Sequence, residues 1–589
     1  MIGMKQERLD AYKKNFGGVQ LNKKYKDAEP KDTINRIKSI LNEIGIDLVC
    51  QTEKHVDGVF TSYLTDPICR WRTEGKGTTI EYCEASAYGE AMEHLCTHYA
   101  FDISTISEEA TKYKGFYRYP DEQVFPVEKI LELSPVIVKE MQEPFERLGR
   151  DIPQNSDLIS LWKKILKSDT TSFVPFFHVN QKKNVLLPDA ILSKLCGTNG
   201  GGCGNSPEEA IGHALDEIVE RWCKYIIFSQ RLTPPQVPDT YIEKRCPELL
   251  KLKQEIQNHG NLKVLIMDAS LGKGYPVMLI VIIDPYTQRY LVNFGCHPQF
   301  EIALERCFTE IFQDRRIVTN LLERKDMAVW ANFDRESIYC QRNWAKLLED
   351  DLGIWPEELF GELPSWQFSE WTIYENYTNK IGMLIQLERL QEDGAEIFIR
   401  NVGFLGFPVY KVYVHGRSTS HINFTEDILF DLNVVNNIEP FLRGELEKDK
   451  MYDFGEKLFG KDSILGRMFF YRLSNEEFDL LHAAFLMEYD NMQSAYKLIR
   501  PWNGEEAIIA RRILEMAQYM ELSKAISCAK TFSSTAMCKF TESFFSDHPF
   551  SEMLTYYKFS SNSRQSMSRK TIQSYTHALI MKMKDYTCP

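Results

Sequence analysis

The chain has 589 residues, of which 43% are hydrophobic and 26% charged, so it has the composition of an ordinary globular protein with roughly two to four domains. Its net charge of −13 argues against a nucleic-acid partner, because an acidic surface repels phosphate backbones. No run approaches the ~18 apolar residues of a membrane span, so we expect no membrane partner. The charged N-terminus lacks a following apolar stretch, which predicts a cytoplasmic protein.

Fourteen cysteines are spread along the chain without a C-x-x-C pair. The nearest two, Cys196 and Cys203, lie seven positions apart. Structural zinc sites use more closely spaced ligands. The spacing therefore favours reduced thiols in a cytosolic protein.

The first 420 residues interleave expected helices and strands. We expect helices at about 30–45, 84–100, 206–228, 300–314 and 377–391, a hairpin within 56–82, and strands at 263–270, 276–285, 290–295, 396–402 and 408–414. This pattern predicts an α/β or α+β fold.

Strand signals almost vanish after about residue 425. Short helices, such as 476–487, 491–498 and 505–520, alternate there with turns. We expect a second, all-α domain over 421–589 that resembles helix-hairpin repeats of the TPR type, although no clean period of about 34 residues emerges.

The segment 206–222 predicts a helix with two different faces. Ser206 is a good N-cap, and Glu209 completes an S-x-x-E capping box. One face is apolar. The other face carries Glu209, His213, Glu217, Glu220 and Arg221.

Two other helices repeat this arrangement. In 84–100, Glu90 and Glu93 lie opposite the apolar face together with Ser86. In 300–314, Arg306 and Glu310 share the outer stripe. From the pattern alone, most such stripes are only solvated helix faces, and an Arg–Glu pair on them is worth roughly 0–1 kcal/mol.

A second interpretation requires the stripes to converge. Glu–Glu pairs brought face to face repel unless a cation lies between them, and Mg²⁺ prefers carboxylate oxygens together with water and substrate phosphates. Arg221 and Arg306 could then hold phosphate oxygens. The glycine loop at 196–205 would let backbone N–H groups approach a phosphate, although it matches neither the P-loop nor the dinucleotide fingerprint. Such a set suits phosphoryl transfer.

Four motifs, in this order, resemble the YcaO family. They are T-x-G-K-G at 73–77, S-A-x-G-E-x-x-E at 86–93, N-G-x-x-x-G-N-x-x-x-E-A at 199–210 with E-x-x-E-R at 217–221, and A-L-E-R-x-x-x-E at 303–310. The resemblance covers roughly residues 20–420. D-A-S-L-G-x-x-Y-P-V at 268–277 and F-G-x-H-P-x-F at 294–300 further resemble the founding type of the family. We therefore expect a catalytic domain at 1–420 and a helical domain at 421–589.

The resemblance implies the cofactors ATP and Mg²⁺ and a reaction at a peptide. Characterised members phosphorylate the oxygen of a backbone amide, which a Cys, Ser or Thr side chain or an external sulfide then replaces, giving azolines, thioamides or amidines. It implies Mg²⁺ ligands at Glu90, Glu93, Glu217 and Glu220. It implies nucleotide contacts, or completion of the Mg²⁺ shell, at Lys26, Thr33, Ser86, Asn205, Glu209, Arg221, Arg306 and Glu310. The residues implied as catalytic are Glu217, Glu220, Arg221 and Arg306.

Two departures from the family pattern bear on the reaction. His94 stands where the family usually has Arg. The chain ends in a single Pro589, whereas azoline-forming members end in a proline-rich tail, which favours the founding type.

Several functions are consistent with the resemblance. The founding type is linked to β-methylthiolation of a small-subunit ribosomal protein as an accessory factor, so a non-catalytic ATP-binding accessory or scaffold protein is the alternative to an amide-activating enzyme. An azoline-forming cyclodehydratase and a thioamide synthase are further alternatives. We expect a peptide or protein substrate, a separate leader-binding or sulfur-supplying partner protein, and a homodimer.

Overall fold

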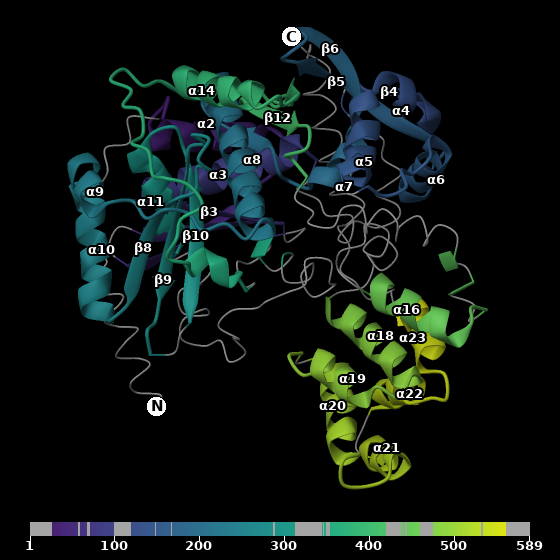
Figure 1. Cartoon of the computed structure of the whole chain (residues 1–589). Coiled ribbons are helices and arrows are strands. Elements are labelled where there is room, and N and C mark those ends of the chain that lie inside the picture. Colours follow the sequence, from purple (N-terminus) through teal and green to yellow (C-terminus); the bar gives the residue numbers. More distant parts are fainter. Residues whose placement is uncertain are drawn as a thin grey trace.

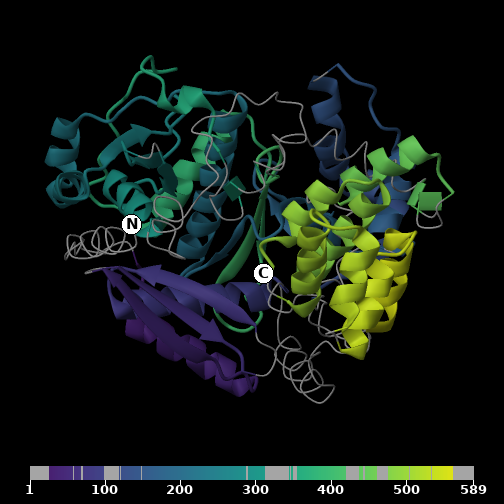
Figure 2. The same ribbon diagram turned by 90° about the horizontal axis from the view of Figure 1, so that it is seen from below.

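The computed structural model describes residues 26–56, 59–67, 71–98, 119, 121–147, 149–166, 168–286, 289–311, 344, 347–348, 354–419, 437–438, 440–441, 445–459, 475–502, 504–531 and 534–560. Up to residue 419 these ranges form three antiparallel sheets with helices packed on them, and the later ranges are helical (Figures 1 and 2). The mixed α+β fold and the following helical part are therefore confirmed. No helix within these ranges is both long and apolar enough to cross a membrane.

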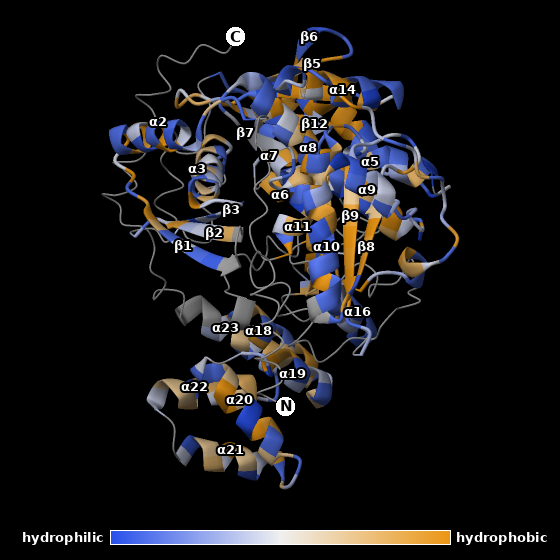
Figure 3. Ribbon diagram, turned by 90° about the vertical axis from the view of Figure 1, so that its left-hand side faces the viewer, coloured by the Kyte–Doolittle hydropathy of each residue, from blue (hydrophilic) through white to orange (hydrophobic). Residues whose placement is uncertain are grey.

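The N-terminal sheet has the strand order β1 (Val49–Val56), β2 (Val59–Thr65), β3 (Arg72–Gly77). The expected hairpin is the β2–β3 pair. Helix α3 (Ile80–Cys96) lies on this sheet, and α2 (Pro30–Glu43) lies on α3 (Figure 3).

Helix α3 begins earlier than expected and lies very close to β3. It begins at Ile80 rather than residue 84 because the Thr79 side chain caps it, accepting from the amide of Tyr82 at 3.3 Å. A Cβ on Gly75 of β3 would stand only 2.2 Å from the backbone nitrogen of Ala87, so only glycine permits this approach.

A second sheet, in the order β10 (Tyr290–Cys296), β9 (Val277–Ile283), β8 (Lys263–Asp268), is buried on both faces. Figure 3 shows β8 and β9 as hydrophobic over most of their length. Consecutive residues, such as Leu265 and Ile266, belong to different core clusters. One cluster contains helix α8 (Pro207–Ser229), and the other contains α9 (Asp239–Arg245), α10 (Pro247–Gly260) and α11 (Phe300–Glu310). Burial of both faces explains the continuous apolar runs in the sequence.

The third sheet brings the glycine loop into contact with both α3 and the helix that follows the loop. Its order is β4 (Gln123–Pro126), β5 (Thr170–His178), β11 (Ile397–Asn401), β12 (Val409–Val414), β7 (Gly201–Cys203), and β6 (Lys183–Pro188) pairs with β5. Strand β7 is thus part of the glycine cluster, and it leads into α8, which contacts β12, β10 and α14 (Asn379–Glu392). The other helices of this region are α4 (Ile130–Leu133), α5 (Pro135–Arg147), α6 (Asn155–Leu166) and α7 (Asp189–Cys196).

The C-terminal ranges form a group of helices below the sheets in the view of Figure 1, and their buried side chains belong to the same hydrophobic cluster as those of the first and third sheets. They are α16 (Lys448–Leu458), α18 (Asn475–Glu488), α19 (Met492–Ile499), α20 (Glu505–Met516), α21 (Leu522–Thr531), α22 (Thr535–Phe544) and α23 (Pro549–Ser560). Helix α18 contacts both α19 and α23. In an open repeat array each unit contacts only its neighbours, so the TPR-like arrangement stays a prediction. The expected domain boundary at 420 and Pro589 lie outside the described residues.

Candidate active site

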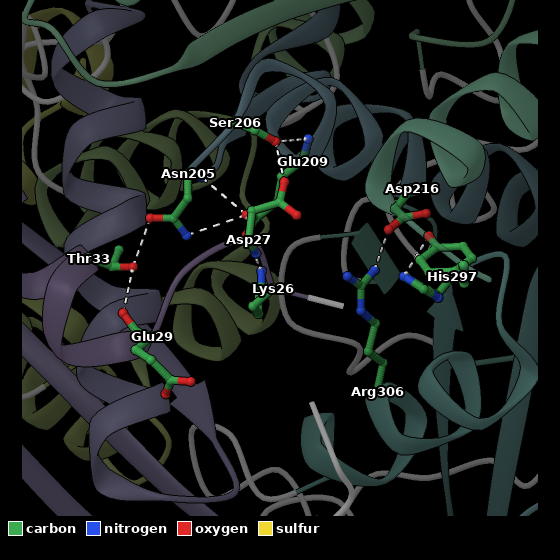
Figure 4. A network of polar contacts seen from close by, with 11 residues as sticks. Lys26, Asp27, Glu29, Thr33, Asn205, Ser206, Glu209, Asp216, His297 and Arg306 are labelled. Carbon is green, nitrogen blue, oxygen red and sulfur yellow. Dashed lines mark hydrogen bonds and ion pairs between the residues drawn. The ribbon is translucent and has the colours of Figure 1, made fainter. Parts of the chain in front are cut away.

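The N-terminus of α8 is tied to the segment that precedes α2. Ser206 caps the helix as expected, accepting from the amide of Glu209 at 3.1 Å. The Glu209 carboxylate accepts instead from Lys26 at 3.0 Å and from the backbone amides of Asp27 and Asn205, each at 3.2 Å (Figure 4). Glu209 therefore joins two distant segments rather than only capping its own helix.

Thr33 extends this connection. Its hydroxyl donates to the Asn205 side-chain oxygen at 2.8 Å (Figure 4). Burial raises the pKa of Glu209, but the Lys26 ammonium and the hydrogen bonds from Asp27 and Asn205 outweigh it and lower the pKa overall. Four expected nucleotide-contacting residues, Lys26, Thr33, Asn205 and Glu209, are thus brought together with Glu209 ionised.

The acidic faces of α3 and α8 meet at the glycine loop. Glu217 accepts from the amide of Gly200 at 3.2 Å. A Cβ on the next residue, Gly201, would lie 2.5 Å from a carboxylate oxygen of Glu93, so Glu93 rests against the same loop. The predicted convergence of these two stripes is therefore observed.

The pKa values of the glutamates reflect this crowding. Burial raises the pKa of Glu93 well above its usual value, and the charges of Glu217 and Glu90 raise it further. Burial, with Glu74 and Glu217, raises the pKa of Glu90 to about 7. Burial also raises the pKa of Glu220, against the opposing effect of Lys76 and Arg306. Bringing these carboxylates together without a cation costs free energy.

This donor set fits Mg²⁺ in chemistry but is not a preformed shell. Carboxylate oxygens are the ligands that Mg²⁺ prefers, with water and phosphate completing its octahedron. Within the described residues, no three His, Cys, Asp or Glu side chains stand close enough together to hold a metal ion.

Each expected phosphate-binding cation is paired with an acid. Arg221 lies 2.7 Å from Glu217, and Lys26 lies 3.0 Å from Glu209. Arg306 donates to Asp216 at 2.7 Å. Lys76 of β3, which was not among the expected residues, pairs with Glu310. The interpretation of these stripes as merely solvated faces therefore does not hold for Glu209, Glu217, Arg306 and Glu310.

Asp216 is a site residue that the sequence interpretation missed. It is only 4% exposed, and it accepts from Arg306, from Gln386 at 2.8 Å and from the Cys296 thiol at 3.7 Å. Burial raises its pKa to about 6, and the bond from Arg306 opposes that rise. Its position seven residues after Glu209 and four before Glu220 placed it on the charged stripe. Gln386 gave no such signal, because nothing in the sequence marks α14 as part of the site.

A pocket lies beside this network. Its cavity volume is about 20 Å³, room for about one water molecule, and it is partly open to solvent. Lys26, His297, Arg306, Tyr377 and Gln386 are among its lining residues. Figure 4 shows Arg306, Asp216 and His297 across from the Lys26–Glu209 group.

Ser86 and His94 contribute less than the other expected residues. Ser86 is exposed on α3, one turn before Glu90, and among the described residues it makes no side-chain hydrogen bond. His94 lies 4.0 Å from Glu90. Burial lowers the pKa of His94 to about 4, so the imidazole is neutral near pH 7 and cannot replace the charge of the family's usual Arg.

A family model described as YcaO cyclodehydratase, ATP- and Mg²⁺-binding, matches residues 74–418, which is more than half of the chain. The chain belongs to the YcaO family. ATP and Mg²⁺ are the cofactors that this YcaO description names, as the resemblance implied.

Curated relatives agree with this assignment. An uncharacterised protein of Haemophilus influenzae is 26% identical over 402 residues, which are 67% of this chain and 65% of the relative. The Escherichia coli ribosomal protein S12 methylthiotransferase accessory factor YcaO is 26% identical over 397 residues, with the same shares. The chain thus spans about 65% of the length of these relatives.

Among solved structures, YcaO from Methanopyrus kandleri bound with AMPPCP and Mg²⁺ is 16% identical to this chain. The match covers 68% of this chain and 94% of that one, with a TM-score of 0.40.

Proposed function

We propose that this chain is an enzyme that uses Mg·ATP to phosphorylate the oxygen of a peptide backbone amide. The observation that carries the proposal is the meeting of Glu93 and Glu217 at the Gly200–Gly201 loop, beside two arginines that are already positioned by acids. Acids that converge at an energetic cost are expected where a cation completes the site.

The acidic and basic residues of the site have different proposed roles. Glu90, Glu93, Glu217 and Glu220 would hold Mg²⁺, which, bound with ATP, supplies a neutralised phosphoryl group. Arg221 and Arg306 would contact phosphate oxygens, which suit the guanidinium geometry as carboxylates do. Catalysis of this kind is mostly positioning and charge neutralisation.

The amide oxygen is the nucleophile in the proposed step. It forms a bond to the terminal phosphorus of ATP as the bond to the leaving ADP breaks. A Cys, Ser or Thr side chain or a sulfide then adds to the amide carbon, and phosphate leaves with the original amide oxygen. No redox partner is needed for this balance.

An isotope experiment tests the step directly. A candidate peptide with heavy oxygen in its backbone carbonyls is incubated with the enzyme, Mg²⁺ and ATP. We expect one heavy oxygen in the released phosphate. Phosphate without heavy oxygen, its one new oxygen coming from water, with ATP consumed, would mean simple hydrolysis and would contradict amide activation.

The same proposal extends to the substrate, to the partner protein and to the product formed from the activated amide. We propose a peptide or protein substrate, presented by a leader-binding or sulfur-supplying partner protein, and a homodimeric enzyme in the cytoplasm. Mass spectrometry of the product separates the two reaction types: loss of one water indicates an azoline, and exchange of oxygen for sulfur indicates a thioamide.

The name of the Escherichia coli relative supports a second candidate, a non-catalytic accessory factor for β-methylthiolation of a small-subunit ribosomal protein. In that role Mg·ATP binds without being consumed, and the C-terminal helices hold the partner. Nucleotide binding without turnover in the presence of the partner would favour this candidate over the enzyme.

A further inference from the structure

Gln386 on α14 is held in one orientation by two acceptors on α8. Its side-chain nitrogen donates to the Asp216 carboxylate at 2.8 Å and to the carbonyl oxygen of Gly212 at 3.4 Å. Reversing the amide would set its oxygen against these two oxygens. The nitrogen end is therefore fixed, and the oxygen end must point away from α8.

Among the residues that the structure describes, none donates a hydrogen bond to the oxygen of the same amide. Gln386 is only 2% exposed, and its Oε1 is a buried acceptor without a donor. A buried acceptor left without a donor typically costs about 1–3 kcal/mol. Gln386 lines the pocket, so a molecule in that pocket can supply the missing donor.

The position of Gln386 indicates which reactant would supply that donor. Three of the residues proposed to contact the nucleotide line this pocket, namely Lys26, Glu209 and Arg306. The α14 side of the pocket, with Met383 and Gln386, lies outside that set. Because the attacking and leaving oxygens of phosphoryl transfer are roughly in line, the second reactant must approach from a side that the nucleotide does not occupy.

We propose that Gln386 Oε1 accepts a hydrogen bond from the N–H group of the reacting amide. This inference rests on the proposed function. A hydrogen bond from the amide N–H orients the carbonyl oxygen toward the phosphate and raises its electron density, which makes it a better nucleophile. The consequence is a specificity rule: secondary amides are accepted, and tertiary amides, including those that precede proline, are not.

A pair of small probes tests this hydrogen bond without knowledge of the natural substrate. N-Methylacetamide carries one N–H group, whereas N,N-dimethylacetamide carries none. Binding of each to the full chain is measured by ligand-observed NMR with Mg²⁺ and a non-hydrolysable ATP analogue present. We expect the wild-type protein to bind the N–H probe roughly tenfold more tightly, as for a single buried hydrogen bond.

Two variants locate the effect. Gln386→Met keeps the length of the side chain and removes the acceptor together with the donor to Asp216 and Gly212, so the preference between the probes should disappear. Gln391→Met, the same change at an exposed position of α14, should preserve it. Affinity for the nucleotide alone should change little in Gln391→Met.

Three results would overturn the inference. They are equal binding of the two probes by the wild-type protein, an unchanged preference in Gln386→Met, and a loss in Gln386→Met of discrimination between ATP and a purine triphosphate lacking the exocyclic amine. The last would assign the oxygen to the nucleobase. Failure of the proposed function is a different result, because the released phosphate would then carry no oxygen from the peptide, whatever the two probes show.

Discussion

The guanidinium of Arg306 on α11 lies 2.7 Å from the carboxylate of Asp216 on α8, ninety positions earlier in the chain. The same nitrogen of Arg306 also donates to the carbonyl oxygen of Cys296. These bonds fix the guanidinium at the edge of the pocket before any phosphate arrives. Such preorganisation reduces the side-chain entropy that is lost on binding.

Arg306→Lys should weaken Mg·ATP binding although it preserves the charge. A lysine ammonium is a point charge that lacks the planar fork, so we expect affinity to fall roughly tenfold or more. Calorimetry on the folded variant measures the change. Arg245→Lys is the matched control, because Arg245 also pairs with an acid, Glu301 of α11, but does not line the pocket. Equal effects of the two substitutions would argue against a role of Arg306 in phosphate binding.

Thr33→Val removes the hydroxyl that joins the α2 segment to Asn205 while preserving the shape of the side chain. The hydrogen bond of 2.8 Å is part of the connection that holds Lys26 near the pocket. We expect a loss of about 1 kcal/mol in the free energy of unfolding and a several-fold loss of nucleotide affinity. Thr52→Val, which removes a hydroxyl bonded to Ser62, should leave nucleotide affinity unchanged. The opposite ranking of the two variants would contradict this assignment.

Gly201→Ala tests the contact between the glycine loop and α3. The new Cβ would lie 2.5 Å from the carboxylate of Glu93, which must then move. We expect a clear loss of Mg·ATP affinity in calorimetry with the fold retained, because a side-chain end can shift more easily than backbone. Gly89→Ala in α3 is the control, since its nearest neighbour would be 4.0 Å away, and normal affinity is expected. Normal affinity in Gly201→Ala would remove Glu93 from the site.

His98, which follows helix α3, should make the free energy of unfolding depend on pH. Its ring stacks on Tyr119 at 4.1 Å, and burial lowers its pKa to about 4 from the usual 6.5. Between about pH 6.5 and 4, this histidine is protonated in the unfolded chain but not in the folded chain. The free energy of unfolding therefore falls as the pH drops below about 6.5 and keeps falling until about pH 4. Between about pH 7 and 5 this amounts to at most about 2 kcal/mol.

The variant His98→Asn isolates that contribution. Asparagine tolerates the left-handed backbone at this position, where φ is 62°. Chemical denaturation of both proteins at neutral and acidic pH should show a smaller loss of stability on acidification in the variant. Identical pH dependence of the two proteins would mean that His98 does not titrate as described.

The sequence was sufficient for features that depend on local pattern. The two-faced helix at 206–222, the cap at Ser206 and the paired strands at 263–295 follow from periodicity and turn chemistry, and the structure confirms them. Ordered motifs predicted that Glu93 and Glu217 would meet. Stripe patterns alone could not show this, since most charged stripes face only water.

The features that were missed depend on tertiary contacts. Asp216 is an ordinary acid in the sequence, and only the packing of α11 and α14 against α8 turns it into a buried partner of Arg306 and Gln386. Strand β1 was not expected, because Cys-Gln-Thr-Glu-Lys-His at 50–55 has little apolar character. The segment forms a strand by pairing with β2, which is a tertiary contact that the local sequence does not show.

The central claim is that glutamates of α3 and α8 together hold Mg²⁺ for ATP. Calorimetry of Mg·ATP binding to wild-type protein, Glu217→Gln and the control Glu208→Gln on the same helix tests it most directly. We predict that binding is lost in Glu217→Gln, because one ligand charge is removed from a dication site, and is retained in Glu208→Gln. Unchanged affinity in Glu217→Gln, with the fold intact, would contradict the claim.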